Sequence, residues 1–307
     1  MKTIIILIQT LFIIAASPLI SGLIRKIKNT LRMRIGASIF QPYYNLIKLF
    51  AKEETVSENT SWIFRFTPLI VFASVVTASL LVPALISPVS FNMMGDFLLI
   101  IFLLALGRFF MALAGLDAAS AFGGMGSSRE MFISGLAEPV AILSVFTVSI
   151  SHGSTSLFVI TNSAAAHFST IIASFSLLMV LIAETSRVPV DNQETHLELT
   201  MVHEAMVLEY SGRSLALIEW ASHIKQIIFF SLIANVMLPW TMPIYGGALS
   251  VAAAGFAVYI LKMAAIAVIV AVIEVSVAKM RLFRVVDFMG FAFILSLAAV
   301  VSAALGL

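Results

Sequence analysis

The 307-residue chain contains no cysteine. This absence excludes disulfide bonds, zinc sites built on thiolates and iron–sulfur clusters ligated within the chain. It also excludes covalent catalysis by a cysteine nucleophile. The five histidines could hold a haem by number alone, but no two of them have a convincing spacing for it.

Charge is also scarce, with 11% charged residues against 61% hydrophobic ones and a formal net charge of only +2. So small a net charge does not favour nucleic acid as a partner. Long apolar runs separated by short polar ones are typical of a protein that crosses a bilayer many times. The sequence therefore predicts one all-α integral membrane domain over residues 1–307.

Eight apolar runs are long enough to cross a hydrocarbon core of ~30 Å as helices. Their continuity argues against a β-barrel, whose strands alternate apolar and polar residues. The expected spans are residues 3–23, 64–86, 97–117, 131–150, 165–186, 213–236, 248–276 and 286–306. The first run could be read as a signal peptide, but its length and the basic residues Arg25, Lys26 and Lys28 after it favour an uncleaved span.

The basic residues gather in alternate loops, above all in residues 24–65, whereas the loops near 87–96, 151–163 and 237–247 contain no Lys or Arg. The positive-inside rule then places both termini outside the cytoplasmic membrane. The first inside loop contains an amphipathic piece, Phe40 to Glu54. It is expected to be a helix that either lies in the membrane interface or packs on its own bundle.

Several ionisable residues fall inside the expected spans. At mid-depth such residues face a bundle interior or water, so they form either static ion pairs or a connected polar track for ions. Two of them, Arg108 and Glu274, lie nearer helix ends and could simply snorkel to the surface. The residues are Arg108, Glu138, Glu184, Glu219, His223, Lys225, Lys262 and Glu274.

The densest charge lies between the fifth and sixth spans, in Glu184 to Arg213. Pro189 is expected to end the fifth helix near Arg187. Asp191 and Glu194 then resemble a capping box that opens a short helix. We expect an acidic reentrant helix at the cytoplasmic surface, without a metal, because no second histidine follows His203 at the spacing of a zinc protease motif. The remaining ionisable residues of this stretch are His196, Glu198, Glu204 and Glu209.

The motif E-T-S-R-V-P-V-D (Glu184 to Asp191), followed by L-E-Y-S-G (Leu208 to Gly212), resembles the subunit 1 family of respiratory complex I. The closest branch is the membrane subunit of formate hydrogenlyase and related membrane-bound nickel–iron hydrogenases. The motifs of that branch are R-F-F-M-A-L-A-G-L-D from Arg108, G-S-S-R-E from Gly126, A-E-P from Ala137 and L-K-M from Leu261.

The resemblance implies an anchor and coupling subunit without a catalytic residue or cofactor of its own. Nickel–iron and iron–sulfur centres would lie on hydrogenase-like large and small peripheral subunits, with antiporter-like membrane subunits alongside. Coupling to protons or sodium would involve Glu138, Glu184, Asp191, Glu194, Glu198, Glu204, Glu209, Glu219, His223, Lys225, Lys262 and Glu274. Docking, or the chamber below the redox subunit, would involve Arg34, Arg108, Asp117, Arg129, Arg187, His196 and His203.

Three other functions stay open at this point. The first is a quinone-reducing complex, although Val190, His196 and the R-I-G-A of Arg34 to Ala37 depart from the family pattern and favour the hydrogenase branch. The second is an independent ion-coupled transporter, although no internal repeat is evident. The third is a purely structural anchor whose charges stabilise packing.

Overall fold

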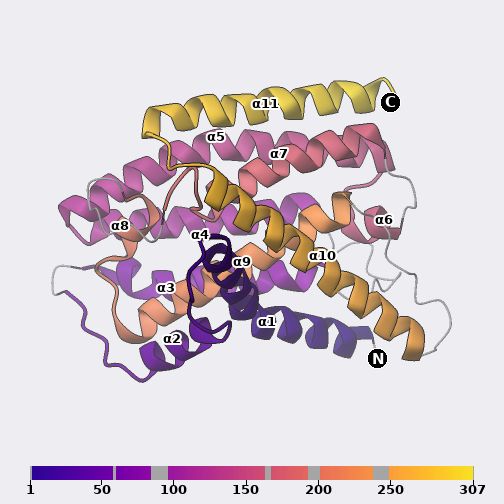
Figure 1. Cartoon of the computed structure of the whole chain (residues 1–307). Coiled ribbons are helices and arrows are strands. Elements are labelled where there is room, and N and C mark those ends of the chain that lie inside the picture. The colour runs from indigo at the N-terminus through magenta and orange to yellow at the C-terminus, as the bar shows by residue number, and fades with distance from the viewer. Residues whose placement is uncertain are drawn as a thin grey trace.

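The computed structural model describes residues 2–57, 60–83, 96–162, 167–192, 201–237 and 249–306. Within these residues the regular structure is helical, apart from one isolated bridge between Asp96 and Ser156. Figure 1 shows the helices gathered in one bundle. They are α1 (Lys2–Leu31), α2 (Gln41–Phe50), α3 (Trp62–Leu81), α4 (Phe97–Asp117), α5 (Ala121–His152), α6 (Leu157–Asn162), α7 (Phe168–Glu184), α8 (His203–Val207), α9 (Gly212–Met237), α10 (Leu249–Ser276) and α11 (Leu282–Ala304).

Seven of these helices are long and apolar enough to cross a membrane, namely α1, α3, α4, α5, α9, α10 and α11. They coincide with seven of the eight expected spans. The remaining one, α7, has 17 residues and falls among the shorter apolar helices. At 1.5 Å per residue it is about 25 Å long, slightly less than the hydrocarbon core. The eighth crossing therefore stays a prediction.

Two helices extend well beyond the apolar runs that predicted them. α1 continues to Leu31, and α5 begins at Ala121 rather than near residue 131. Ser120 explains the early start of α5, because its hydroxyl accepts a hydrogen bond from the Gly123 N–H and caps the helix. The 32 residues of α5 span about 48 Å, which exceeds the hydrocarbon core.

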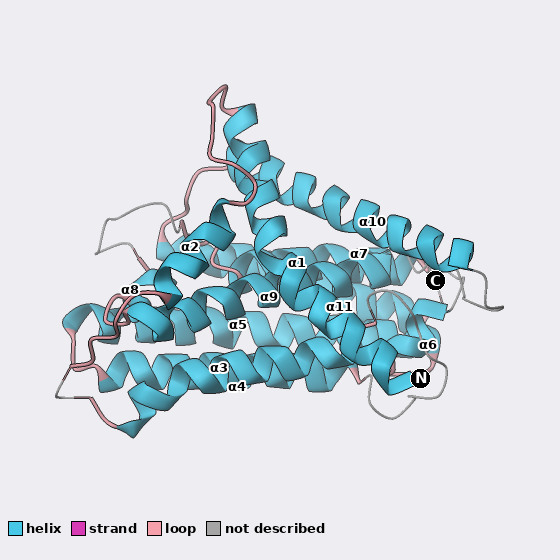
Figure 2. Ribbon diagram, turned by 90° about the horizontal axis from the view of Figure 1, so that it is seen from below, coloured by secondary structure: helices cyan, strands magenta, loops and turns pink. Residues whose placement is uncertain are grey.

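The two ends of the bundle differ. The N-terminal end of α1, the C-terminal end of α11 and the short α6 lie together at one end, and α2 and α8 lie at the other (Figures 1 and 2). α2 packs on α9 and α1 through the buried Pro42 and Leu46, yet its Ile47 is exposed. The expected packing of this helix on its own bundle is therefore confirmed, whereas its place in the membrane interface stays a prediction.

α9 lies in the interior and contacts α1, α2, α3, α7 and α10. It has the lowest mean hydropathy of the seven long helices, yet 67% of its apolar stretch is buried, against 33–50% for the others. Polar residues of a span are expected to face protein rather than hydrocarbon, because lipid offers them no partner. The interior of this bundle is consequently where its ionisable side chains meet.

Candidate functional site

The site forms where the chain leaves α7 and crosses the bundle. α7 ends at Glu184, and the Val188–Pro189 peptide is cis. Backbone hydrogen bonds from Asp191 N–H and Val190 N–H to the Arg187 carbonyl, at 3.1 and 2.9 Å, fold the segment back on itself. We call residues 184–192 the crossing turn. The expected break before Pro189 is confirmed.

A first ion cluster surrounds Arg108 on α4. Its guanidinium donates to Glu184 at the start of the crossing turn, to Glu138 on α5 at 2.8 Å and to the Ser134 hydroxyl at 3.0 Å. Lys225 on α9 lies 2.8 Å from the other oxygen of Glu184, close enough for an ion pair but without hydrogen-bond geometry. The cluster Arg108, Glu138, Glu184 and Lys225 thus has two acids and two bases, and it joins four helices.

Burial makes this cluster sensitive to the loss of a charge. The side chains of Arg108 and Glu184 are 10% and 4% exposed, whereas that of Glu138 is 42% exposed. Removing one partner of a buried ion pair costs about 3–5 kcal/mol, because the other charge is left without compensation. Glu138 is the member whose carboxylate has access to space around the cluster.

A second ion cluster lies on the other side of the crossing turn. Arg187 donates to Glu274 on α10 at 2.5 Å, and Lys28 on α1 binds the second oxygen of Glu274 at 3.1 Å. Arg187 also donates to the Gln226 side-chain oxygen on α9 at 2.9 Å. The cluster Lys28, Arg187 and Glu274 therefore ties α1, α9 and α10 to the crossing turn.

A hydroxyl extends this second cluster into the interior. Ser21 on α1 donates to Gln226 at 2.8 Å and lies 2.8 Å from Nδ1 of His223. His223 and Lys225, two residues apart on α9, consequently point to different clusters, as their spacing predicts.

Asp191 ends the crossing turn and anchors the segment that follows. It pairs with Lys279 at 2.8 Å and accepts long hydrogen bonds, of 3.3 and 3.4 Å, from the N–H groups of Val202 and His203. It therefore stabilises the start of α8. The expected capping box reaches Glu194, which lies outside the described residues together with His196 and Glu198.

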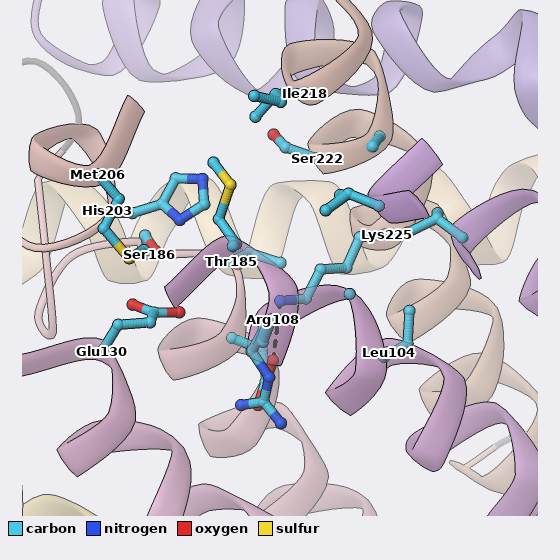
Figure 3. Close-up of a pocket in the computed structure, with 16 residues that line it drawn as sticks. Leu104, Arg108, Glu130, Thr185, Ser186, His203, Met206, Ile218, Ser222 and Lys225 are labelled. Carbon is cyan, nitrogen blue, oxygen red and sulfur yellow. Dashed lines mark hydrogen bonds and ion pairs between the residues drawn. The ribbon is translucent and has the colours of Figure 1, made fainter. Parts of the chain in front are cut away.

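Two cavities adjoin the clusters. The first encloses about 610 Å³ and the second about 620 Å³ of empty space, part of it open to solvent. Thr185 and Ser186 of the crossing turn and Ser222 of α9 line both cavities, so the crossing turn and α9 form their common wall. Figure 3 shows the first cavity with Arg108 and Lys225 on one side and His203 and Glu130 on another. The second cavity is bordered by the second ion cluster and His223.

The structure brings many of the predicted residues to these cavities or clusters. They are Arg108, Glu138, Glu184, Arg187, Asp191, His203, His223, Lys225 and Glu274. The idea that Arg108 and Glu274 snorkel to the surface is wrong, because their side chains are only 10% and 4% exposed and both are held in ion pairs.

Other predicted residues lie elsewhere. Arg34 and Glu209 are exposed, and the buried Lys262 lines neither cavity. Glu204 and Glu219 are half-buried outside both cavities.

Two further predicted residues have clear packing roles. The carboxylate of Asp117 accepts hydrogen bonds from the Ser61 N–H and hydroxyl, both at 2.8 Å, and so holds the start of α3. Arg129 donates to the Met201 carbonyl at 3.0 Å and holds the segment before α8.

Sequence reasoning missed several residues of the site. Lys28 enters the sequence analysis only as part of the basic flank of the first span and Lys279 only as one of the basic loop residues, although both bind buried acids. Gln226 and Ser21 were overlooked because neither is charged, yet a glutamine within an apolar span was a visible signal. Glu130 was noted only as part of a motif, and it lines the first cavity.

The segment between α8 and α9 is held by an aromatic contact. The Tyr210 ring stacks on Phe64 with centroids 4.1 Å apart, and its hydroxyl donates to the Phe64 carbonyl at 3.0 Å. Burial raises the pKa of the Tyr210 hydroxyl. This tyrosine therefore stays a neutral donor and fixes the segment to α3.

Metal binding finds no support among the described residues, which contain no group of three His, Asp or Glu side chains placed to hold an ion. The charged groups of the site can instead hold, exchange or respond to protons and other ions.

A family model described as NADH dehydrogenase matches residues 2–304. The chain belongs to this family. The family resemblance inferred from Glu184 to Asp191 and the other motifs is thereby confirmed, since this family includes subunit 1 of complex I.

Two relatives of this chain come from Escherichia coli K12. Hydrogenase-4 component C is 34% identical over 238 residues, which cover 76% of this chain and 75% of the relative. Formate hydrogenlyase subunit 4 is 29% identical over 285 residues, which cover 90% of each chain.

A solved structure shares the fold. A chain of the membrane-bound sulfane sulfur reductase, an archaeal respiratory membrane complex, superposes with a TM-score of 0.81. The match covers 97% of this chain and 99% of that chain at 18% identity. At this identity the likeness concerns the fold alone.

Proposed function

We propose that this chain is the membrane subunit that anchors the redox subunits of a hydrogenase-type complex and couples their reaction to ion movement across the membrane. The single observation that carries the proposal is the crossing turn. It holds Glu184, Arg187 and Asp191 in three buried ion-pair systems and forms the wall between two cavities.

The sequence and the relatives support a proposal about the partners in such a complex. Without cysteine, the chain cannot ligate an iron–sulfur cluster by thiolates, so electrons would travel on other subunits. The E. coli relatives are named as parts of a hydrogenase and a formate hydrogenlyase. We propose large and small peripheral subunits carrying nickel–iron and iron–sulfur centres, with antiporter-like membrane subunits beside this chain.

The proposed orientation follows from loop charge and bundle geometry. Both chain ends lie at the end of the bundle opposite α2 and α8, and the basic first loop lies near α2 (Figure 2). The positive-inside rule then makes the α2–α8 end cytoplasmic. The redox subunits would dock there, next to the crossing turn and the acidic stretch.

The physical basis of coupling would be competition among buried charges. Glu184 is shared between Arg108 and Lys225. When one carboxylate takes up a proton, the base that was paired with it pairs with another carboxylate. A new charge near the docked end changes the pKa values of the same groups and so shifts which pairs form. Pairs of interacting groups therefore transmit a charge change along the bundle.

The decisive experiment removes the Glu184–Lys225 pair in steps. We expect Glu184→Gln and Lys225→Gln each to reduce recovery of the assembled complex, because each leaves the first ion cluster with an unbalanced charge, at a cost of up to about 3–5 kcal/mol. We expect the double variant to assemble and to pass electrons to an artificial acceptor. It should nevertheless lose ion uptake in reconstituted vesicles, because Gln cannot titrate.

The double variant separates coupling from packing. If the pair only stabilises the bundle, removing both charges restores assembly and ion uptake together, and the coupling proposal fails. Glu53→Gln is the matched control, because Glu53 is exposed in the loop after α2 and should change neither quantity. Uptake is measured for protons and for sodium separately.

A quinone-reducing complex is the second candidate, because the first cavity has an apolar wall beside its charged end. Val75, Leu104 and Met206 belong to that wall. A pocket with apolar sides and a few polar groups suits a quinone. Quinone-dependent electron transfer by the purified complex, lost in a Leu104→Trp variant that fills the cavity, would favour this candidate.

A further inference from the structure

Glu130 on α5 is a buried residue that has no hydrogen-bond or ion-pair partner in the part of the chain that the structure describes. Its exposed fraction is 5%. Among the described residues, no hydrogen bond and no ion pair reaches its carboxylate, in contrast to Glu184 and Glu274. Removing a carboxylate from water costs several kcal/mol unless a partner, water or a proton compensates it. The first cavity is the place from which that compensation can come, because Glu130 lines it.

The position of Glu130 on its helix connects it to the first ion cluster. Glu130, Ser134 and Glu138 are spaced four residues apart, so they lie on one side of α5 over successive turns. Ser134 and Glu138 both accept hydrogen bonds from Arg108. The stripe on α5 therefore runs from Glu130 to the first ion cluster over about 12 Å.

α8 brings a second titratable group to the same part of the cavity. His203 is the first residue of α8, and its N–H is bound by Asp191 of the crossing turn. Close packing of Gly126 on Ala205 sets α8 directly against α5. Figure 3 shows His203 and Glu130 on the side of the cavity away from Lys225.

We infer that Glu130 exchanges protons between the first cavity and the α8 end of the bundle, with His203 as its neighbour in this exchange. In the forward step, the His203 imidazolium on α8 gives its proton to a Glu130 carboxylate oxygen and becomes a neutral imidazole. In the return step, the same proton passes to cavity water beside the first ion cluster, and Glu130 regains its negative charge. Arg108, Lys225 and Glu184 are the other charged groups that line the cavity.

This inference rests on the proposed function, because a proton exchanged at Glu130 matters only if the bundle moves or responds to protons. It goes beyond that function by naming the proton as the coupled ion and by assigning its route on the α8 side. Histidine and carboxylate side chains are the groups that most often act as general acids and bases in protein proton transfer.

The test uses the intact complex reconstituted in vesicles. We expect Glu130→Gln to assemble at the wild-type level and to keep electron transfer to an artificial acceptor. Proton uptake should fall roughly tenfold or more, within the range of general acid–base effects. Glu130→Asp should keep most of the uptake, because it keeps the titrating group. A structural role would not separate the Gln and Asp variants in this way.

Two results would overturn the inference: full proton uptake by Glu130→Gln, or sodium uptake alone in the wild-type complex. If Glu130→Gln fails to assemble, proton uptake is measured on Glu130→Met instead, because methionine fills a similar volume without an unmet polar group. Full proton uptake by Glu130→Met would then overturn the inference. The outcomes also distinguish the two proposals. Glu130→Gln could keep normal proton uptake while the Glu184→Gln/Lys225→Gln double variant loses it. That result would support the proposed function and contradict the role of Glu130.

A spectroscopic measurement gives a readout independent of turnover. Infrared difference spectra of the complex, reduced minus oxidised, should contain a protonated-carboxyl band that disappears in Glu130→Gln and shifts in D₂O. Glu53→Gln should leave that band unchanged, because Glu53 is exposed to solvent. A band that persists in Glu130→Gln assigns the proton to another acid and contradicts the inference.

Discussion

Arg108 is one side chain with three partners on two other elements. It binds Ser134 and Glu138 on α5 and Glu184 at the end of α7. A guanidinium presents several donors in a fixed plane, which suits simultaneous contact with two carboxylates. The residue thus determines how α4, α5 and the crossing turn meet.

We expect Arg108→Lys to impair the protein although charge is conserved. A lysine ammonium is a compact charge and cannot reach both carboxylates and Ser134 at once. Arg108→Ala should be worse and cost about 3–5 kcal/mol, because the buried Glu184 keeps only Lys225 as a base and Glu138 loses the base that it contacts. Thermal unfolding of the purified complex measures both effects. Arg65→Lys, at an exposed site on α3, should leave the unfolding temperature unchanged.

At the residue scale, the ionisable members of the site could be predicted but their partners could not. The sequence identifies Glu184 and Glu274 as candidates because a charged residue within an apolar span usually has a functional or pairing role. Which base each one meets depends on which helices face each other, and no local pattern specifies that. Lys28 shows the difficulty, since it belongs to the basic run after the first span but binds Glu274 inside the bundle.

Among the elements, α8 shows how contacts can hold a helix too short to be stable alone. It has five residues, fewer than an isolated helix needs in water. Asp191 binds its first N–H groups, and a Cβ placed at Gly126 of α5 would lie 2.9 Å from Ala205 and from the Val202 carbonyl oxygen. α8 therefore depends on a close approach to α5.

Two glycines on α5 provide a matched test of this dependence. Gly126→Ala should displace α8 and destabilise the protein by about 1–3 kcal/mol, the usual cost of overpacking. Gly124→Ala meets nothing within 4 Å and should stabilise the helix by up to about 1 kcal/mol. Protease sensitivity of residues 201–211, compared between the two variants, reports whether α8 has moved. Equal sensitivity would contradict the close-approach argument.

Apolar runs predicted where elements exist but not where they end. The α4 bounds match the expected span, because Asp96 caps the helix just where the apolar run begins. The early start of α5 was missed because it depends on the Ser120 cap and not on hydrophobicity. Hydropathy reports the membrane, whereas caps and glycines determine the ends of helices.

At the scale of the whole molecule, loop charge predicts which end of the bundle faces the cytoplasm. Labelling from one side of the membrane tests this orientation. Because the chain has no cysteine, one introduced cysteine reports its own side of the membrane. We expect Ser154→Cys, between α5 and α6, to react with an impermeant thiol reagent in intact cells. Ser57→Cys, before α3, should react only after lysis. The reverse labelling pattern would contradict the proposed orientation, and with it the cytoplasmic docking surface.

The polarity of α9 has a consequence for how the protein is made. A charged residue at the centre of a lone helix adds about 2.5–3.5 kcal/mol to the free energy of membrane insertion. α9 carries Glu219 and Lys225 in a span of low mean hydropathy, so by itself it should leave the translocon on the water side. Glu184, which pairs with Lys225 of α9, lies earlier in the chain and is synthesised before α9. A reporter fused after α9 should therefore show stable insertion when residues 1–184 precede the helix, and failure when α9 is presented alone. Insertion of α9 into the membrane would thus depend on helices that were inserted before it.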